Sequence, residues 1–240
     1  MINVLDYGIV ADNIAIDNTP AWNNLIANIG ADRDIYFPAG IYYFNSCPNI
    51  INKVVSVRGC GINATSLIRN FSTTNFDNAL FHSTATFNLS GTGILAGTGT
   101  SGGSAILLNG LQASASTLRD LYITGQVGGT WAVPLHLKSS DPLGIRSVYI
   151  ENVELFAATT CIAWMINPKG LTMSNVQGYP AGGTVGHMTI QHSGAIRPSN
   201  IDIRTRYLET LYLYNSDNVT ITSTPSTVVN QNNCTKVKVY

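Results

Sequence analysis

The sequence predicts an all-β solenoid of short stacked strands in one domain, with a short helix covering its N-terminal end. Three observations predict this class. Of the 240 residues, 45% are hydrophobic and only 11% charged, and Gly, Ser, Thr and Asn recur throughout the chain, as expected for many short strands joined by turns. Apolar-x-apolar segments return at spacings of about 18 to 30 residues, which indicates stacked coils. Only one segment, near the N-terminus, has helical periodicity.

Residues 1–34 are expected to form an entry turn and this helix. Asn18 or Thr19 can cap the helix, Pro20 suits its first position, and Gly30 suits its C-terminal exit. Its apolar face, at helical spacing, consists of Trp22, Leu25, Ile26 and Ile29. Because the open end of a strand stack exposes core and unpaired edges, we expect the helix to cover that end.

Residues 35–240 are expected to form the rungs of the solenoid. Leu118–Gly125 matches Ile145–Asn152 in apolar and polar positions at an offset of 27 residues (145 − 118). Similar segments are Val55–Gly59, Leu171–Asn175, Ile201–Arg204 and Val219–Thr222. A β-sandwich is the competing interpretation, but it favours strand spacings nearer 8–12 residues and hairpin signals, of which Asn109-Gly110 is the single example. The segment Ser90–Ser104, nearly all Gly, Thr and Ser, is expected to be a loop projecting from the stack.

The N-terminal residues carry a recognisable pattern in three blocks. The blocks are Asp6-Tyr7-Gly8-Ile9-Val10-Ala11-Asp12-Asn13, then Asp17-Asn18-Thr19-Pro20-Ala21-Trp22, then Ile35-Tyr36-Phe37-Pro38-Ala39-Gly40-Ile41-Tyr42. This pattern resembles the N-terminal signature of the pectate-lyase-3 group of β-helix proteins, which is common in bacteriophage tailspikes. Ala11 and Asn13 replace two glycines of that signature. The resemblance implies a right-handed, single-stranded parallel β-helix, in which Asp6, Asp12 and Asp17 hold the entry turn and the cap.

The resemblance also implies a range of functions. Members of the group include lyases and glycoside hydrolases that act on capsule, O-antigen or pectin, and also non-catalytic receptor-binding or structural virion proteins. We therefore expect a tailspike-like protein that recognises and depolymerises a bacterial surface polysaccharide, with a non-catalytic virion β-helix protein as the alternative. The group further implies a homotrimer, contacts with other virion tail proteins, and a place in the phage tail or outside the cell.

Composition argues against several other classes. The formal net charge is zero and no basic patch is visible, which argues against a nucleic-acid partner. No apolar run approaches the ~18 residues of a membrane-spanning helix, and the N-terminus lacks the pattern of a classical signal peptide. We expect no cofactor and no metal: the four cysteines lie far apart, and alternation along a strand puts His187 and His192 on opposite faces.

Candidate site residues follow from an assumed register in which Leu121, Val148, Leu171 and Ile201 all point inward. One outward column then reads Tyr122, Tyr149, Thr172, Asp202, and a second reads Thr124, Glu151, Ser174, Arg204. Tyrosine rings cover sugar faces while polar groups bind hydroxyls, so Tyr122, Tyr149 and Asp120 are the predicted substrate-binding residues. A solvated sheet face is the competing interpretation.

The predicted catalytic residues are Glu151, Asp202 and Arg204. A lyase needs a cation near a carboxylate, and Glu151 or Asp202 with Arg204 supplies that combination. A glycosidase needs two carboxyls about 5–5.5 Å or 6.5–9.5 Å apart. The assumed register puts Asp120 roughly 13 Å from Glu151 along the strand, and Glu151 two rungs and two residues from Asp202, so no intrachain pair is convincing. Depolymerase, glycan-binding protein and purely structural β-helix all stay open.

Overall fold

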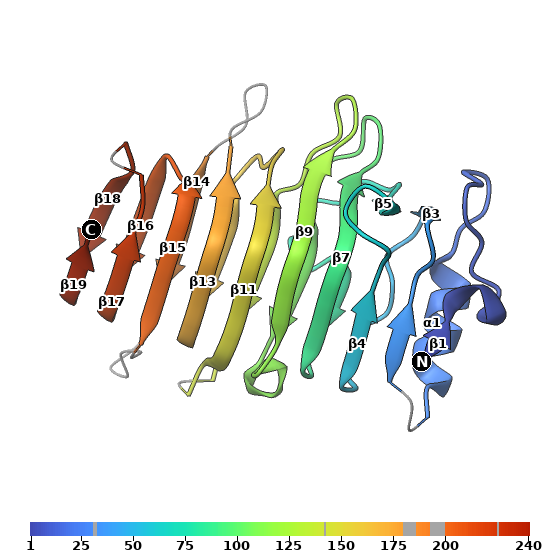
Figure 1. The fold of residues 1–240 in the computed structure, drawn as a ribbon, viewed down its shortest axis with the longest axis horizontal. Helices are drawn as coiled ribbons and strands as arrows, with labels where there is room; N and C mark the ends of the chain where they lie inside the picture. The colour runs from blue at the N-terminus through green and yellow to red at the C-terminus, as the bar shows by residue number, and fades with distance from the viewer. Residues whose placement is uncertain (31–32, 142, 180–185, 193–199, 225) are drawn as a thin grey trace.

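The computed structural model describes residues 1–30, 33–141, 143–179, 186–192, 200–224 and 226–240. The chain is a right-handed parallel β-helix, as the sequence predicts (Figure 1). The helical segments are η1 (Val4–Tyr7), α1 (Thr19–Asn28) and η2 (Leu111–Ala113). No helix in the described part of the chain is both long and apolar enough to span a membrane.

The described strands form two parallel sheets. The large sheet contains β1 (Ile2–Asn3), β2 (Asp34–Tyr36), β3 (Gly40–Phe44), β4 (Val55–Arg58), β5 (Thr65–Arg69), β7 (Phe87–Ala96), β9 (Thr117–Gly125), β11 (Ile145–Leu155), β13 (Pro168–Gly178), β15 (Ile201–Tyr207), β17 (Asp217–Thr222) and β19 (Thr235–Val239). The small sheet contains β6 (Ala79–Ser83), β8 (Ser104–Asn109), β10 (Val133–Lys138), β12 (Ala163–Ile166), β14 (His187–Gln191), β16 (Thr210–Tyr214) and β18 (Val228–Asn232).

From β6 onward the chain alternates between the two sheets, so each coil adds one strand to each of them. Figure 1 shows the large-sheet strands side by side, from the N-terminal cap to the C-terminal end. Inward side chains of both sheets form one continuous core, in which Leu121, Val148 and Ile203 are at most 1% exposed. Each coil packs on its neighbours, and the pairing is regular except for shifts between β13 and β15 after Ser174.

The helix α1 covers the N-terminal end of the core, as predicted. Trp22 is fully buried and its ring centroid lies 5.8 Å from that of Phe37 and 5.7 Å from that of Phe81. Asn18 is the N-cap residue, but its side chain bonds the backbone N–H and carbonyl of Val10 at 2.7 and 2.9 Å rather than the helix itself. The cap is thus tied to the entry turn as well as to the core.

Two of the three N-terminal aspartates hold this entry region by accepting hydrogen bonds. Asp12 accepts from the backbone N–H of Ile41 at 2.8 Å. Asp17 accepts from the N–H groups of Thr19 and Asn45 and from the hydroxyl of Ser46. Partial burial raises the pKa of the Asp17 carboxyl, but these hydrogen bonds outweigh it and leave the pKa below its ordinary value.

The long strands bend in the middle at a residue in the left-handed conformation. The bend residues are Gly91, Asp120, Asn152 and Asn175, with φ between 52° and 65°. The Asn152 amide donates to Asp120 Oδ1 at 3.0 Å, and the Asn175 amide donates to Asn152 Oδ1 at 2.8 Å. Asn and Asp tolerate positive φ better than other residues with a side chain, so they suit the bend, and their side-chain hydrogen bonds link successive coils.

The expected projecting loop at Ser90–Ser104 is wrong over most of its length. Strand β7 runs on to Ala96, β8 begins at Ser104, and only residues 97–103 connect them. The small residues serve close packing instead: a Cβ at Gly93 would lie 2.8 Å from the carbonyl oxygen of Ile62. A Gly- and Thr-rich composition does not distinguish a loop from a strand whose neighbours approach closely.

The assumed register is wrong between β9 and β11 and correct beyond it. Leu121 pairs with Val153 rather than Val148, so the true offset is 32 residues (153 − 121) instead of 27. Val148 does pair with Leu171, and Thr172 with Asp202. Strand β11 contains two similar apolar-x-apolar segments, at Val148 and at Val153. The sequence pattern around Leu121 fits either of them, and the assumed register used the first.

Candidate functional site

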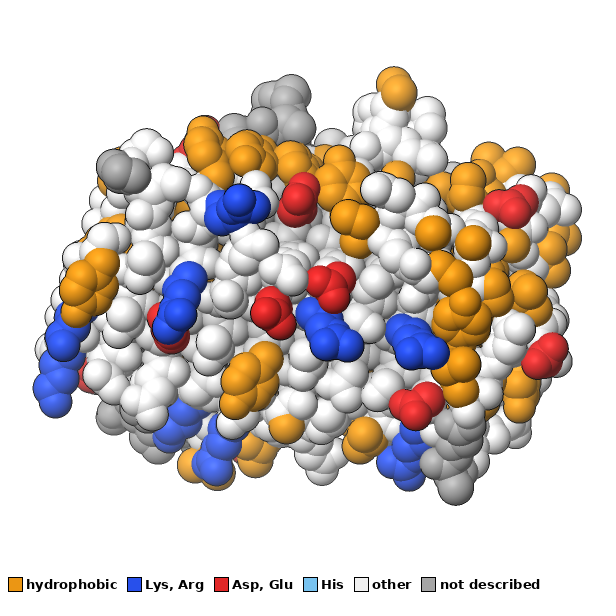
Figure 2. Space-filling view, in the orientation of Figure 1, with side chains coloured by type: hydrophobic (Ala, Val, Ile, Leu, Met, Phe, Trp, Pro, Cys, Tyr) orange, Lys and Arg blue, Asp and Glu red, His pale blue; other side chains and the backbone are white. Residues whose placement is uncertain are grey.

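The observed pairing defines two columns of outward side chains on the large sheet. Column one contains Ser56, Asn88, Thr117, Tyr149, Thr172, Asp202 and Thr220. Column two contains Arg58, Ser90, Arg119, Glu151, Ser174, Arg204 and Thr222. Successive members lie on strands about 4.8 Å apart, so both columns run along the axis of the β-helix. Figure 2 shows this face, with basic and acidic side chains along its middle.

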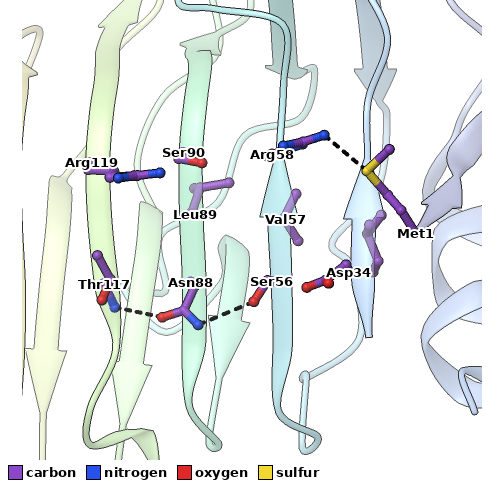
Figure 3. A pocket seen from close by; sticks show the side chains of 11 residues that line it. Met1, Asp34, Ser56, Val57, Arg58, Asn88, Leu89, Ser90, Thr117 and Arg119 are labelled. Atoms are coloured by element: carbon purple, nitrogen blue, oxygen red, sulfur yellow. Dashed lines mark hydrogen bonds between the residues drawn. The ribbon is translucent and has the colours of Figure 1, made fainter. Parts of the chain in front are cut away.

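The N-terminal end of the two columns is hollowed into a cavity of about 530 Å³ (Figure 3). Asn88 organises it, because its amide donates to Ser56 Oγ at 3.2 Å and its carbonyl accepts from the Thr117 N–H at 3.0 Å. Arg58 and Arg119 lie on either side of Ser90. The cavity therefore offers two guanidinium groups and the Asp34 carboxylate together with hydroxyl and amide groups.

A second cavity, of about 480 Å³, lies over the C-terminal part of the same columns. It is lined by Thr172, Asp202, Arg204 and Thr220 among others. Arg204 donates to Asp202 Oδ2 at 3.0 Å, which fixes both side chains on the surface. Two of the three residues predicted as catalytic are thus brought together here.

A third hollow, of about 350 Å³, lies beside the bends of the long strands, and Asp120, Glu154, Gln177 and Arg206 line it. Glu151 pairs with Arg119, the residue before Asp120. The separation of roughly 13 Å expected between Asp120 and Glu151 is therefore wrong, because it came from the incorrect register. Asp120 and Glu151 lie on adjacent strands and only one residue out of register.

The two tyrosines predicted to bind substrate do not stack. Tyr149 pairs with Thr117 and Thr172 and is 52% exposed, so its ring stands alone in column one. Tyr122 pairs instead with Glu154, and its ring centroid lies 5.5 Å from that of Phe156. The expected pair was a product of the shifted register.

An aromatic ladder that sequence reasoning missed runs along the end of the long strands. It contains Tyr122, Phe156, Tyr179 and Tyr207, with neighbouring ring centroids 4.5–5.5 Å apart. The available signal was an aromatic residue near the end of each of the four strands β9, β11, β13 and β15. The hydroxyl of Tyr179 donates to Gln177 Oε1 at 2.9 Å, so the ladder adjoins the third hollow.

The assumed register is correct for Glu151 and Arg204, and their catalytic role stays a prediction. Both lie in column two with Ser174 between them, and Glu151 lies two strands and two residues from Asp202. Among the residues that the structure describes, no group of three or more His, Cys, Asp or Glu is arranged to bind a metal ion. The chemistry that this face offers is hydrogen bonding and charge pairing.

No protein-family model matches the chain, and no curated protein sequence matches it. Several solved structures are similar to it. The A-module of the mannuronan C-5 epimerase AlgE4 from Azotobacter vinelandii is 16% identical with a TM-score of 0.46, over 100% of this chain and 74% of that one. ORF18 of Geobacillus virus E2 is 12% identical with a TM-score of 0.42, over 99% and 60%. The Streptococcus pneumoniae surface protein and adhesin PfbA is 10% identical with a TM-score of 0.33, over 99% and 98%. At these identities and scores the similarities assign no activity to the chain.

Proposed function

We propose that this protein is a tailspike-like β-helix module that binds a bacterial surface polysaccharide, capsule or O-antigen, along columns one and two. One observation carries the proposal: two cavities of about 530 and 480 Å³ lie over the same pair of columns. From Arg58 to Thr222 the columns cross six strand intervals, a track of about 29 Å at about 4.8 Å each. Such a track accommodates several consecutive sugar units.

The side chains of the track suit an acidic polysaccharide. Column two carries three arginines, Arg58, Arg119 and Arg204, and one carboxylate, Glu151. Column one adds Asp202, which pairs with Arg204, and Asp34 lines the first cavity. Arg119 is therefore the arginine nearest the centre of the track, and within the described part of the chain it pairs with no carboxylate. A guanidinium group binds a carboxylate through two parallel hydrogen bonds, and serine, threonine and asparagine exchange hydrogen bonds with hydroxyls. The exposed ring of Tyr149 offers an apolar face to a sugar at the centre of the track.

Depolymerisation of the bound polymer is the second candidate function. Glu151 lies in the track, and the observed register brings Asp120 to within about 6 Å of it between Cα atoms, by the spacing and rise of parallel strands. Cα atoms at that separation allow the two side chains to bring their carboxyl groups to the roughly 5–5.5 Å of retaining or 6.5–9.5 Å of inverting glycosidases. In this candidate Glu151 is the acid, Asp120 is its partner, and Asp202 and Arg204 bind the chain two strands away.

The proposal extends to the setting of the protein. The N-terminal resemblance to the pectate-lyase-3 group supports a place in a phage tail or outside the cell, a homotrimeric assembly, and contacts with other virion tail proteins. Sedimentation equilibrium of the purified chain tests the assembly, with three times the monomer mass as the expected result. A monomeric mass at micromolar concentration would contradict the trimer without affecting the track.

Binding to immobilised capsule and O-antigen polysaccharides tests the track itself. The double variant Arg119→Gln/Arg204→Gln is expected to lose at least tenfold in affinity for the polymer that the wild type binds. Arg146→Gln is the matched control, because Arg146 is exposed on β11 but lies outside both columns. Equal losses in the double variant and the control would contradict the track.

Polymer size separates the two candidate functions. If the protein cleaves its ligand, Glu151→Gln is expected to abolish shortening and keep binding, while Glu209→Gln, an exposed acid elsewhere, keeps both. New reducing ends without ultraviolet absorbance would indicate a hydrolase, and absorbance of unsaturated uronic acids would indicate a lyase. Full turnover in Glu151→Gln would remove Glu151 from the proposed mechanism.

A further inference from the structure

The outer face of the small sheet carries a separate cavity, of about 440 Å³. Strand β10 supplies His136 and Lys138, β12 supplies Trp164, and the connection from β5 to β6 supplies Phe76 and Asp77. A hydrogen bond holds this connection against the small sheet: the Ser104 hydroxyl donates to the Phe76 backbone carbonyl at 2.8 Å. The cavity is thus built by three parts of the chain, on the sheet opposite the track.

Aromatic rings form much of the wall. His136 and Trp164 occupy paired positions on adjacent strands, and their rings stack at 5.6 Å with an interplanar angle of 15°. Phe76 meets Trp164 edge-on, at 6.3 Å and 66°. Such a wall offers flat apolar surface to a ligand.

Polar atoms without partners lie within the same wall. His136 is 3% exposed, and within the described part of the chain neither of its ring nitrogens has a hydrogen-bond partner. The indole nitrogen of Trp164 is likewise buried and without a partner there. Buried polar groups in folded proteins nearly always have partners, so three such atoms beside one cavity point to a ligand that supplies them.

The charges around the cavity cancel. Lys138 and Asp77 form an ion pair at 2.8 Å. Burial lowers the pKa of His136 to about 4, which leaves its ring neutral near pH 7, with one N–H donor and one acceptor. A ligand that matches this wall is therefore neutral and carries both hydrogen-bond donors and acceptors.

We propose that this cavity is a second glycan-binding site, which accepts one neutral hexose unit. The C–H face of the sugar packs on Phe76 and Trp164. Its hydroxyls bond the ring nitrogens of His136 and the indole N–H, which have almost no exposed surface without the sugar and become accessible by a shift of the rings on binding. The proposal rests on the proposed function for the class of ligand but not for the location, since the track lies on the other sheet. The volume of the cavity beside His136 and Trp164 falls within the range of small-molecule sites, about 300–1,000 Å³.

Tryptophan fluorescence tests the site without modification of the protein. The chain has three tryptophans, of which Trp22 and Trp131 are fully buried, so Trp164 is the one that can respond to a bound sugar. Methyl glycosides of glucose, galactose, mannose and rhamnose are titrated to millimolar concentrations. We expect a saturable change with at least one of them, and no saturable change with any would overturn the proposal.

The variant His136→Phe identifies the contacts. It keeps a ring against Trp164 and removes both nitrogens, and we expect at least a tenfold loss of affinity for the responding sugar. Saturation-transfer NMR of the wild type gives a second readout if this variant does not fold. Saturation of the aromatic protons of the protein, those of Trp164 and Phe76 included, should pass to the protons of the bound sugar. An unchanged affinity in a folded variant, or no transfer in the wild type, would contradict the proposal.

A crossed comparison separates this site from the track. Arg119→Gln/Arg204→Gln should lose polymer binding and keep the monosaccharide response. His136→Phe should lose the response and keep polymer binding through the track. If only the first result holds, the track stands and the second site is wrong; if only the second holds, the track is wrong and this site stands.

Discussion

Acidification from pH 7 to pH 5 is expected to destabilise the fold through two buried histidines, His136 and His192. His192 is 4% exposed; its Nε2–H donates to the Pro168 carbonyl at 3.0 Å, and its Nδ1 lies 3.1 Å from the Ser216 hydroxyl, which donates to the Tyr214 carbonyl at 3.1 Å. Burial lowers the pKa of both histidines to about 4, from an ordinary value of 6.5.

The direction of the change in stability depends on whether the folded or the unfolded chain binds protons at the higher pH. Below pH 6.5 the unfolded chain takes up protons that the folded chain refuses until about pH 4, so stability is full above pH 6.5 and falls between these values. At pH 5 the loss is about 2 kcal/mol for each histidine, or about 4 kcal/mol together. The lowered pKa of Asp17 acts only below its ordinary value of 3.8, outside this window.

Urea unfolding at pH 7 and pH 5, followed by circular dichroism, measures the effect. In thermal unfolding of a chain of this size, a loss of about 4 kcal/mol in the free energy of unfolding corresponds to a drop in melting temperature of roughly 8–16 °C. The variant His136→Phe should retain at least half of the pH dependence, since His192 still titrates and burial also lowers the pKa of His82 and of His187. Coincident unfolding curves at the two pH values would refute the assignment of both rings as buried and neutral.

Substitutions at three positions test what holds the coils together. Gly129→Ala is expected to cost about 2 kcal/mol or more, because a Cβ there would lie 2.5 Å from two backbone carbonyl oxygens. Asn152→Ala should cost about 3 kcal/mol, from a strained positive φ and the lost bonds to Asp120 and Asn175, whereas Asn152→Gly should cost about half as much. Arg69→Met should cost about 2 kcal/mol, because the buried guanidinium bonds backbone carbonyls, including that of Thr130, in two neighbouring connections. Chemical denaturation measures each, and equal stability of Asn152→Ala and Asn152→Gly would contradict the role of backbone strain.

The fold was predictable because its signals are local and repeated. Pro20, the helical spacing of Trp22 and the short apolar-x-apolar segments each report on local structure, and the structure agrees with them. Strand register is a different kind of information. Leu121 could pair with Val148 or Val153 without any change in the inside–outside pattern, and only three-dimensional packing selects Val153.

The candidate site was predictable in part for the same reason. Arg204 and Asp202 come together because they share one strand, two residues apart, so no register is needed to place them on one face. Asp120 and Glu151 lie on different strands, and the wrong register separated them. The cavity beside His136 and Trp164 depends on a connection that crosses the outer face of the small sheet, and alternation along a strand carries no information about such a cover.

The most direct test of the central claim is the binding of purified capsule and O-antigen polysaccharides to the intact protein and to Arg119→Gln/Arg204→Gln. Biolayer interferometry at two salt concentrations measures the affinity of each. We expect the wild type to bind at least one acidic polymer, more weakly at high salt, and the double variant to lose at least tenfold in affinity. Tight binding that is unaffected by the loss of both arginines would contradict the track on the large sheet.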